Sequence, residues 1–156
     1  MLVLLAEQMA SIASAAEAAW PSEGCGLLIG TGRRIVTVTR VMPACNLLEA
    51  EGNDRFELDP AVRFAAERAV RGTELRVVGH WHSHPDGSAS PSATDLAQAW
   101  EPELIWLIVG TAADGAGRPQ TVQMRAHRLD RDAGRVFAVR IEVAEKRACH
   151  AARFPT

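Results

Sequence analysis

Residues 75–95, LRVVGHWHSHPDGSASPSATD, contain the strongest structural signals in the chain. The first ten of these residues contain two adjacent valines and a tryptophan and stop at Pro85, which predicts a strand at 75–84. A short loop of polar and small residues follows, and Ser92 has the side-chain chemistry of a helix N-cap, which predicts a helix at 92–100. The end of a strand and the start of a helix are therefore expected to converge.

Two histidines in the predicted strand, His82 and His84, are separated by one residue. Strand side chains alternate between two faces, so both imidazoles project the same way and lie close enough to share one ion. Asp95, three residues after Ser92, shares its side of the first helical turn. Two neutral imidazoles and one carboxylate suit zinc and leave a fourth tetrahedral position for water, as a catalytic site needs. The spacing therefore predicts a catalytic zinc centre that binds one ion per chain.

A general base and a hydrogen-bond donor would complete this site. Zinc lowers the pKa of bound water towards about 7, yet a base is still useful to move the proton to a leaving amine. Glu23 is the candidate base, because it precedes a predicted strand at 24–30 in which Gly24 and Gly26 leave room for close backbone approach. Ser92 is expected to donate a hydrogen bond to the developing oxyanion, in a supporting and not a nucleophilic role.

The rest of the pattern predicts a single domain, a mixed α/β sheet with helices on its faces. Helices are expected at 7–20, which is rich in alanine and is ended by Pro21, and at 60–71, which begins at Asp59-Pro60 and stops before Gly72. The other expected elements are a strand or helix lead-in at 2–5, a hairpin of 24–30 and 34–40, an irregular loop at 42–54, and strands at 55–58, 104–110, 121–128 and 135–143. We therefore place the domain at 1–143 and a tail at 144–156, whose order the sequence leaves open.

Charge and cysteine usage narrow the class of partner and compartment. A formal net charge of −2 leaves no basic surplus for nucleic acid or an anionic membrane, so neither is expected as a partner. The N-terminal apolar segment lacks a basic n-region and is interrupted by Glu7, and both features disfavour a signal peptide. The segment is also too short to span a membrane. The cysteines are odd in number, far apart and in no Cys-x-x-Cys pair, which predicts a reducing cytoplasm and no thiolate zinc site: Cys25, Cys45 and Cys149.

Each feature of the site also has a simpler interpretation. The spacing from Ser92 to Asp95 is that of a capping box, and a lone His-x-His can be two solvated or hydrogen-bonded imidazoles. Glu23 alone would be read as a solvated residue before a strand. His80 shares the face of the two other histidines, but three alternate strand positions span roughly 13 Å, too far for one ion. Only the combination favours a metal centre.

The combined residues match the E, H-x-H-x7-S-x2-D motif of the JAMM (MPN-plus) zinc metalloproteases: Glu23, His82-Ser83-His84-Pro85, Ser92 and Asp95. Further segments resemble the small bacterial and archaeal branch of that family, over roughly residues 1–143: PSEGCGLLIG at 21–30, RFELDP at 55–60 and WLIVG at 106–110. The resemblance implies a cytidine-deaminase-like α/β core and one zinc ion. It also implies hydrolysis of a peptide or isopeptide bond after the C-terminal diglycine tail of a ubiquitin-like protein.

The resemblance further suggests a substrate. Family members that cut ubiquitin chains carry insertions that hold the second ubiquitin, and this chain has no long insert in the matching places, which favours a small sulfur-carrier protein. Peptidases that release cysteine from such a carrier are the specific candidate, and the carrier tail is expected to add as a strand to a sheet edge. The alternatives are a deubiquitinase-like deconjugase of another ubiquitin-fold protein, a non-catalytic binding module of the same fold, and a zinc deaminase, whose Pro-Cys-x-x-Cys signature the sequence lacks.

Overall fold

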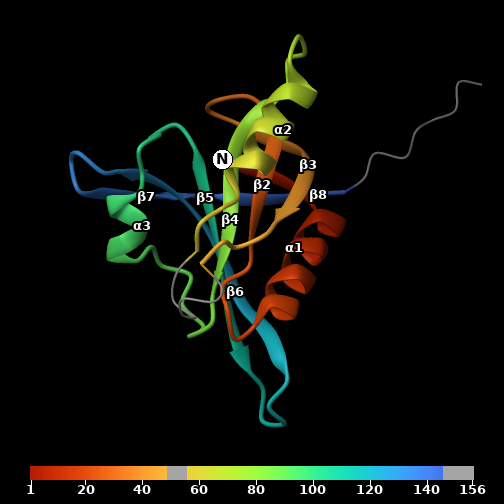
Figure 1. Cartoon of the computed structure of the whole chain (residues 1–156), viewed down its shortest axis with the longest axis vertical. Helices are drawn as coiled ribbons and strands as arrows, with labels where there is room; N and C mark the ends of the chain where they lie inside the picture. Colours follow the sequence, from red (N-terminus) through yellow and green to blue (C-terminus); the bar gives the residue numbers. More distant parts are fainter. Residues whose placement is uncertain (49–55, 146–156) are drawn as a thin grey trace, which may run out of the picture.

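The computed structural model describes residues 1–48 and 56–145. This part of the chain forms one mixed eight-stranded sheet with three helices (Figure 1), which confirms the predicted α/β class. The elements in chain order are β1 (Leu2–Leu5), α1 (Ala6–Ala19), β2 (Cys25–Thr31), β3 (Val36–Ala44), α2 (Pro60–Val70), β4 (Arg76–His84), α3 (Ala93–Ala97), β5 (Ile105–Ala113), β6 (Pro119–Asp130), β7 (Arg135–Val139) and β8 (Ile141–Ala144). No helix within the described ranges is long and apolar enough to cross a bilayer.

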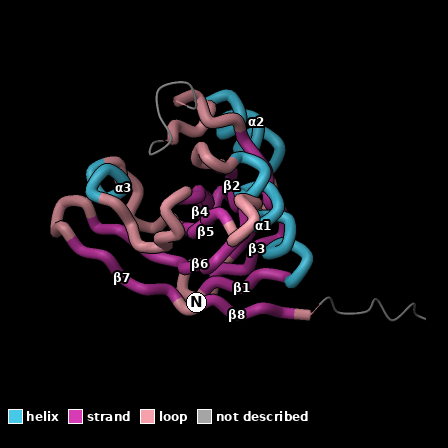
Figure 2. The backbone as a smooth tube through the Cα atoms, turned by 90° about the horizontal axis from the view of Figure 1, so that it is seen from below, coloured by secondary structure: helices cyan, strands magenta, loops and turns pink. Residues whose placement is uncertain are grey.

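The strand order is β7-β6-β5-β4-β2-β3-β1-β8, so two strands that are consecutive in the chain lie at opposite ends of the order. Only Arg140 separates β7 from β8, and its carbonyl accepts a hydrogen bond from the N–H of Leu2 at 2.8 Å. β7 pairs with β6 at one end of the strand order, and β8 pairs with β1 at the other end. Because β8 follows β7 almost directly, the two ends of the sheet must lie close together, which requires a strongly curved sheet. Figure 2 shows β8 continuing in line from β7. The prediction of one strand at 135–143 is wrong in this respect.

The two faces of the sheet have separate cores. Leu28 of β2 packs with Ile12 and Ala16 of α1 in the larger core, which also contains Trp81 and Leu107. The neighbours of Leu28 in the strand project the other way and pack against α2: Leu27 and Ile29. Because side chains alternate along β2, α1 and α2 cover opposite faces. The histidines of β4 project from the α2 side, since Trp81 between them faces α1.

The helix starts follow the sequence signals closely. Asp59 accepts a hydrogen bond from the N–H of Ala61 at 2.8 Å, Pro60 is the first residue of α2, and Gly72 has a φ of +79° just after the helix. The segment 2–5, for which the sequence left a strand and a helix lead-in open, is strand β1, and the helix predicted at 7–20 is confirmed as α1, shifted by one residue.

Several predicted boundaries are wrong. β3 begins and ends later than predicted because it pairs with β2 as far as Ala44, so the first residues of the predicted 42–54 loop are strand. The expected strand at 55–58 is reduced to one bridge between Asn46 and Leu58 in the described residues. α3 stops at Ala97 because the chain turns to bury Ala99 beside Trp106 and Leu129. Residues 49–54 of the loop and 146–156 of the tail lie outside the described residues.

Candidate metal centre

His82 and His84 lie at the end of β4, between β2 and β5 near the middle of the sheet. The side chain of His82 is fully buried and that of His84 is nearly so. Their Nε2 atoms are 3.0 Å apart. The two imidazoles therefore converge on one point, as strand alternation predicts.

The carboxylate of Asp95 closes a triangle with the two imidazoles. Its Oδ1 lies 3.2 Å from Nε2 of His82, and its Oδ2 lies 3.4 Å from Nε2 of His84. A tetrahedral zinc site with metal–ligand distances of about 2.0 Å has edges of about 3.3 Å between its ligand atoms. The three side chains from β4 and α3 thus have the chemistry and the mutual spacing that suit one zinc ion.

The same carboxylate also caps its own helix. The hydroxyl of Ser92 accepts a hydrogen bond from the N–H of Asp95 at 3.0 Å, and Oδ2 of Asp95 accepts one from the N–H of Ser92 at 2.6 Å. The capping box and the ligand cluster are therefore not alternatives. The cap fixes the rotamer of Asp95 and so holds its carboxylate towards the histidines.

Glu23 stands just before β2 with only 5% of its surface exposed. Its carboxylate and the imidazoles of His82 and His84 offer ligand atoms that all lie within 4.8 Å of one another. The hydroxyl of Ser83, between the two histidines, accepts a hydrogen bond from the N–H of Gly24 at 2.9 Å. The strand that carries both imidazoles therefore also holds the backbone beside Glu23. The sequence motif specifies no residue type at position 83, so this role of Ser83 was not predicted.

The ionisation of the cluster suits a cation. Burial would raise the pKa of Asp95, but hydrogen bonds from His82 and His84 outweigh burial and hold this pKa well below its usual range. Burial lowers the pKa of His82, which keeps that imidazole neutral. Burial also acts to lower the pKa of His84, but the hydrogen bond to Asp95 prevails and raises it. Asp95 is therefore an ionised carboxylate that faces two imidazoles, and this negative charge is available to a bound cation.

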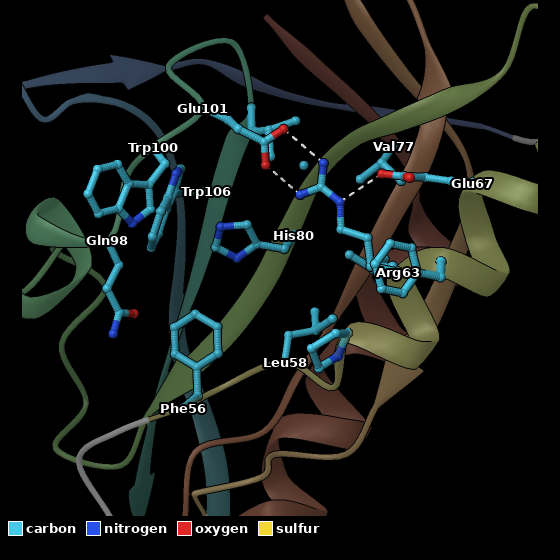
Figure 3. Close-up of a pocket in the computed structure, with 15 residues that line it drawn as sticks. Phe56, Leu58, Arg63, Glu67, Val77, His80, Gln98, Trp100, Glu101 and Trp106 are labelled. Atoms are coloured by element: carbon cyan, nitrogen blue, oxygen red, sulfur yellow. Dashed lines mark hydrogen bonds and ion pairs between the residues drawn. The ribbon is translucent and has the colours of Figure 1, made fainter.

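His80, the competing third histidine, faces a separate cleft of about 390 Å³ beside the cluster (Figure 3). Its ring centroid is 6.0 Å from that of His82 and 4.2 Å from that of Trp106, and its Nδ1 is buried without a hydrogen-bond partner in the described part of the chain. The cleft lies between α2 and the segment after α3, and its lining is mostly apolar: Leu27, Phe56, Leu58, Phe64, Trp100 and Trp106.

Two contacts define the ends of this cleft. At one end the guanidinium of Arg63 donates two hydrogen bonds to the carboxylate of Glu101, at 2.5 and 2.8 Å, which ties α2 to the segment after α3. At the other end the ring of Phe56 stacks on that of His82, with centroids 4.3 Å apart and an angle of 15° between the planes. The cleft and the candidate metal centre therefore share a wall.

The connection from His84 to Ser92 is held by residues that the sequence did not single out. His127, which is not part of the sequence motif, is buried with its Nε2 2.9 Å from the carbonyl oxygen of Ala89. The amide of Gln123 donates to the carbonyl of Gly87 at 2.7 Å. Both side chains come from β6, whose alternation was the one signal that could have placed them on this face.

Comparison with known proteins agrees with this geometry. A family model for prokaryotic homologs of the JAB domain matches residues 5–129. The desampylase of Haloferax volcanii is 35% identical over 122 residues, 78% of this chain and 80% of that protein. The CysO-cysteine peptidase of Mycobacterium tuberculosis is 28% identical over 130 residues, 83% of each chain.

A solved structure described as a JAMM metalloprotease-like zinc site in the proteasome and signalosome shares the fold, with a TM-score of 0.51 at 20% identity over 92% of this chain and 96% of the other. The resemblance read from the motif is thereby confirmed, and the mixed sheet is the one that JAMM/MPN proteins share. Since the family model covers most of its length, the chain belongs to the prokaryotic homologs of the JAB domain.

Proposed function

We propose that the chain is a zinc-dependent peptidase or isopeptidase that cleaves the bond following the C-terminal diglycine tail of a ubiquitin-like sulfur-carrier protein. The observation that carries the proposal is the convergence of two imidazoles and one carboxylate at tetrahedral spacing, with the buried Glu23 beside them. Such a set leaves one coordination position open, which distinguishes a catalytic zinc site from a closed structural one.

His82, His84 and Asp95 would hold the ion. When bound, zinc lowers the pKa of water towards about 7 and polarises a carbonyl group. The carboxylate of Glu23 takes the proton of the attacking water and delivers it to the nitrogen of the leaving amine. The hydroxyl of Ser92 donates a hydrogen bond to the substrate oxygen as negative charge develops there, since its Oγ already accepts from the N–H of Asp95 and its O–H remains free to donate.

The relatives and the cleft support a protein substrate. The relatives are named a desampylase and a CysO-cysteine peptidase, and the latter matches the cysteine-releasing activity that the sequence suggested. The apolar cleft beside His82 suits an uncharged side chain of a polypeptide, because its only described guanidinium, that of Arg63, is already paired with Glu67 and Glu101. A peptide tail could then reach the metal centre while one side chain is held by the cleft.

The test is incubation of the zinc-loaded chain with sulfur-carrier proteins that bear C-terminal extensions, read by intact mass. We expect cleavage after the diglycine, and we expect Glu23→Gln to keep zinc while its turnover falls at least a hundredfold. Glu74→Gln, at an exposed glutamate away from the site, is the matched control and should cleave normally. Full activity of Glu23→Gln would remove the proposed base. Failure of the zinc-loaded wild type on every ubiquitin-like substrate would favour a non-catalytic binding module.

A further inference from the structure

The side chain of Asn46, just after β3, joins three backbone segments near the candidate metal centre. Its Nδ2 donates a hydrogen bond to the carbonyl of Glu23 at 3.0 Å. Its Oδ1 accepts from the N–H groups of Leu48 and Glu57, both at 3.0 Å. A carbonyl on one side and two N–H groups on the other fix which end of the amide is oxygen.

The hydrogen bond to Glu23 is one of two that hold the peptide unit between Glu23 and Gly24 at its opposite ends. The carbonyl of that unit belongs to Glu23 and is held by Asn46, while its N–H belongs to Gly24 and is held by the hydroxyl of Ser83 at 2.9 Å. Because a peptide unit is planar, two hydrogen bonds at its opposite ends fix its orientation. The carboxylate of Glu23, attached to the preceding Cα, is thereby held relative to the histidines that flank Ser83.

The bonds on the other side of Asn46 act on the cleft wall. Glu57, which Asn46 holds through its N–H, follows Phe56, whose ring stacks on His82. The same pairing is reinforced by a hydrogen bond from the N–H of Leu47 to the carbonyl of Glu57 at 2.9 Å. One amide therefore links the backbone of the candidate base with the residue next to the shared wall.

We propose that Asn46 is a positioning residue of the reaction: it orients the carboxylate of Glu23 towards the metal centre. It also keeps the segment that carries Phe56 in a fixed position relative to that carboxylate. The inference rests on the proposed function. Asn46 acts through Glu23 and does not touch the reacting atoms. A misplacement of a catalytic group by about 1 Å can cost a hundredfold in rate, so the effect belongs to kcat.

Asn46→Asp separates the two functions of the side chain: donation to the carbonyl of Glu23, and acceptance from the N–H groups of Leu48 and Glu57. The carboxylate keeps an acceptor for Leu48 and Glu57, but it loses the donor to Glu23 and sets an oxygen against that carbonyl. We expect kcat to fall about a hundredfold with KM within about twofold, whereas Asn46→Ala should also raise KM because the wall is released. Zinc affinity should stay within about threefold in both variants. Gln120→Glu makes the same chemical change at an exposed site and should alter neither constant.

Two further measurements keep the assignment testable. In a Glu23→Gln background, Asn46→Asp should cost nothing more, because residues that act through one group are not additive. Amide exchange at Gly24 should be at least about tenfold faster in Asn46→Asp, as one end of the peptide unit is released. Wild-type kcat in Asn46→Asp, or the same loss in both backgrounds, would overturn the assignment while the proposed function stands. If the zinc-loaded wild type cleaves nothing, the proposed function fails and the role of Asn46 falls with it.

Discussion

Ser83 and Gly24 are joined by a pair of hydrogen bonds: the hydroxyl of Ser83 accepts from the N–H of Gly24 at 2.9 Å, and the N–H of Ser83 donates to the carbonyl of Gly24 at 2.9 Å. Ser83 is fully buried and lies between His82 and His84. Two metal-ligand candidates and the backbone next to the candidate base are therefore held by hydrogen bonds to one central strand.

Removal of this hydroxyl should destabilise the fold and slow the reaction. Ser83→Ala leaves the buried N–H of Gly24 without its acceptor, which costs about 1–3 kcal/mol of unfolding free energy. Denaturant unfolding of the zinc-loaded protein measures the loss, and kcat should fall with it as Glu23 becomes less well placed. Ser14→Ala, at an exposed helical serine, should stay within about 0.5 kcal/mol of the wild type. Equal unfolding curves for both variants would show that the contact contributes nothing.

The ligand set can be tested by metal content. Asp95→Asn keeps an oxygen that can accept from the N–H of Ser92 but loses the negative charge, so the helix cap should survive while zinc falls from about one per chain to near zero. His82→Ala should lose zinc as well. His80→Asn is the matched control, because His80 lies in the cleft, and it should retain about one zinc per chain. Retention of zinc by Asp95→Asn and its loss from His80→Asn would support the three-histidine geometry instead.

Stability and zinc affinity should respond to pH in opposite directions. The pKa of His84 is raised above its ordinary value, burial opposing and the hydrogen bond to Asp95 prevailing. A group with a raised folded-state pKa contributes stability that is complete below its unfolded pKa of about 6.5 and is lost as pH rises through the folded value. Metal-free protein should therefore become less stable from about pH 6.5 upwards. Zinc must displace the same proton, so its affinity should rise over that range, by up to about tenfold per pH unit.

Thermal unfolding of chelator-treated protein and zinc competition titrations measure the two trends. The Asp95→Asn variant is the control for the first, since it removes the carboxylate that raises the pKa of His84. A wild-type melting temperature that does not fall between about pH 6.5 and pH 8 would contradict the raised pKa of His84.

Local signals in the sequence predicted much of the fold and the residues that the structure brings together at the site. Strand alternation placed His82 and His84 side by side, and the cap chemistry of Ser92 placed Asp95 in the first turn of its helix. The contacts that hold these groups were not predictable, because Ser83 and Gly24 are 59 residues apart and Asn46 and Glu23 are 23 apart. The division of 135–143 between two edges depends on the curvature of the whole sheet, which no segment encodes alone.

The two described cysteines should differ in reactivity. Burial, with smaller contributions from Cys45 and Glu23, raises the pKa of the Cys25 thiol to about 12, whereas Cys45 is exposed. The thiolate is the reactive form, so iodoacetamide should label Cys45 readily and Cys25 only after unfolding. Mass spectrometry in a Cys149→Ser background limits the count to these two thiols. Equal labelling rates in the folded protein would show that Cys25 is not shielded.

The apolar cleft should contribute to substrate binding and not to metal binding. Phe64 lies on its rim with 65% of its surface exposed, so Phe64→Asp should cost little stability while placing a charge where an uncharged side chain is expected. We expect KM for the cleaved carrier to rise at least tenfold with kcat and zinc content unchanged, because the lost contact serves ground state and transition state alike. Phe137→Asp, at a phenylalanine of β7 that is 50% exposed and outside the cleft, is the matched control and should leave KM unchanged. If kcat falls in Phe64→Asp while KM holds, the cleft supports the site through the Phe56 wall and does not hold the substrate, since a binding contact common to both states cannot produce that result.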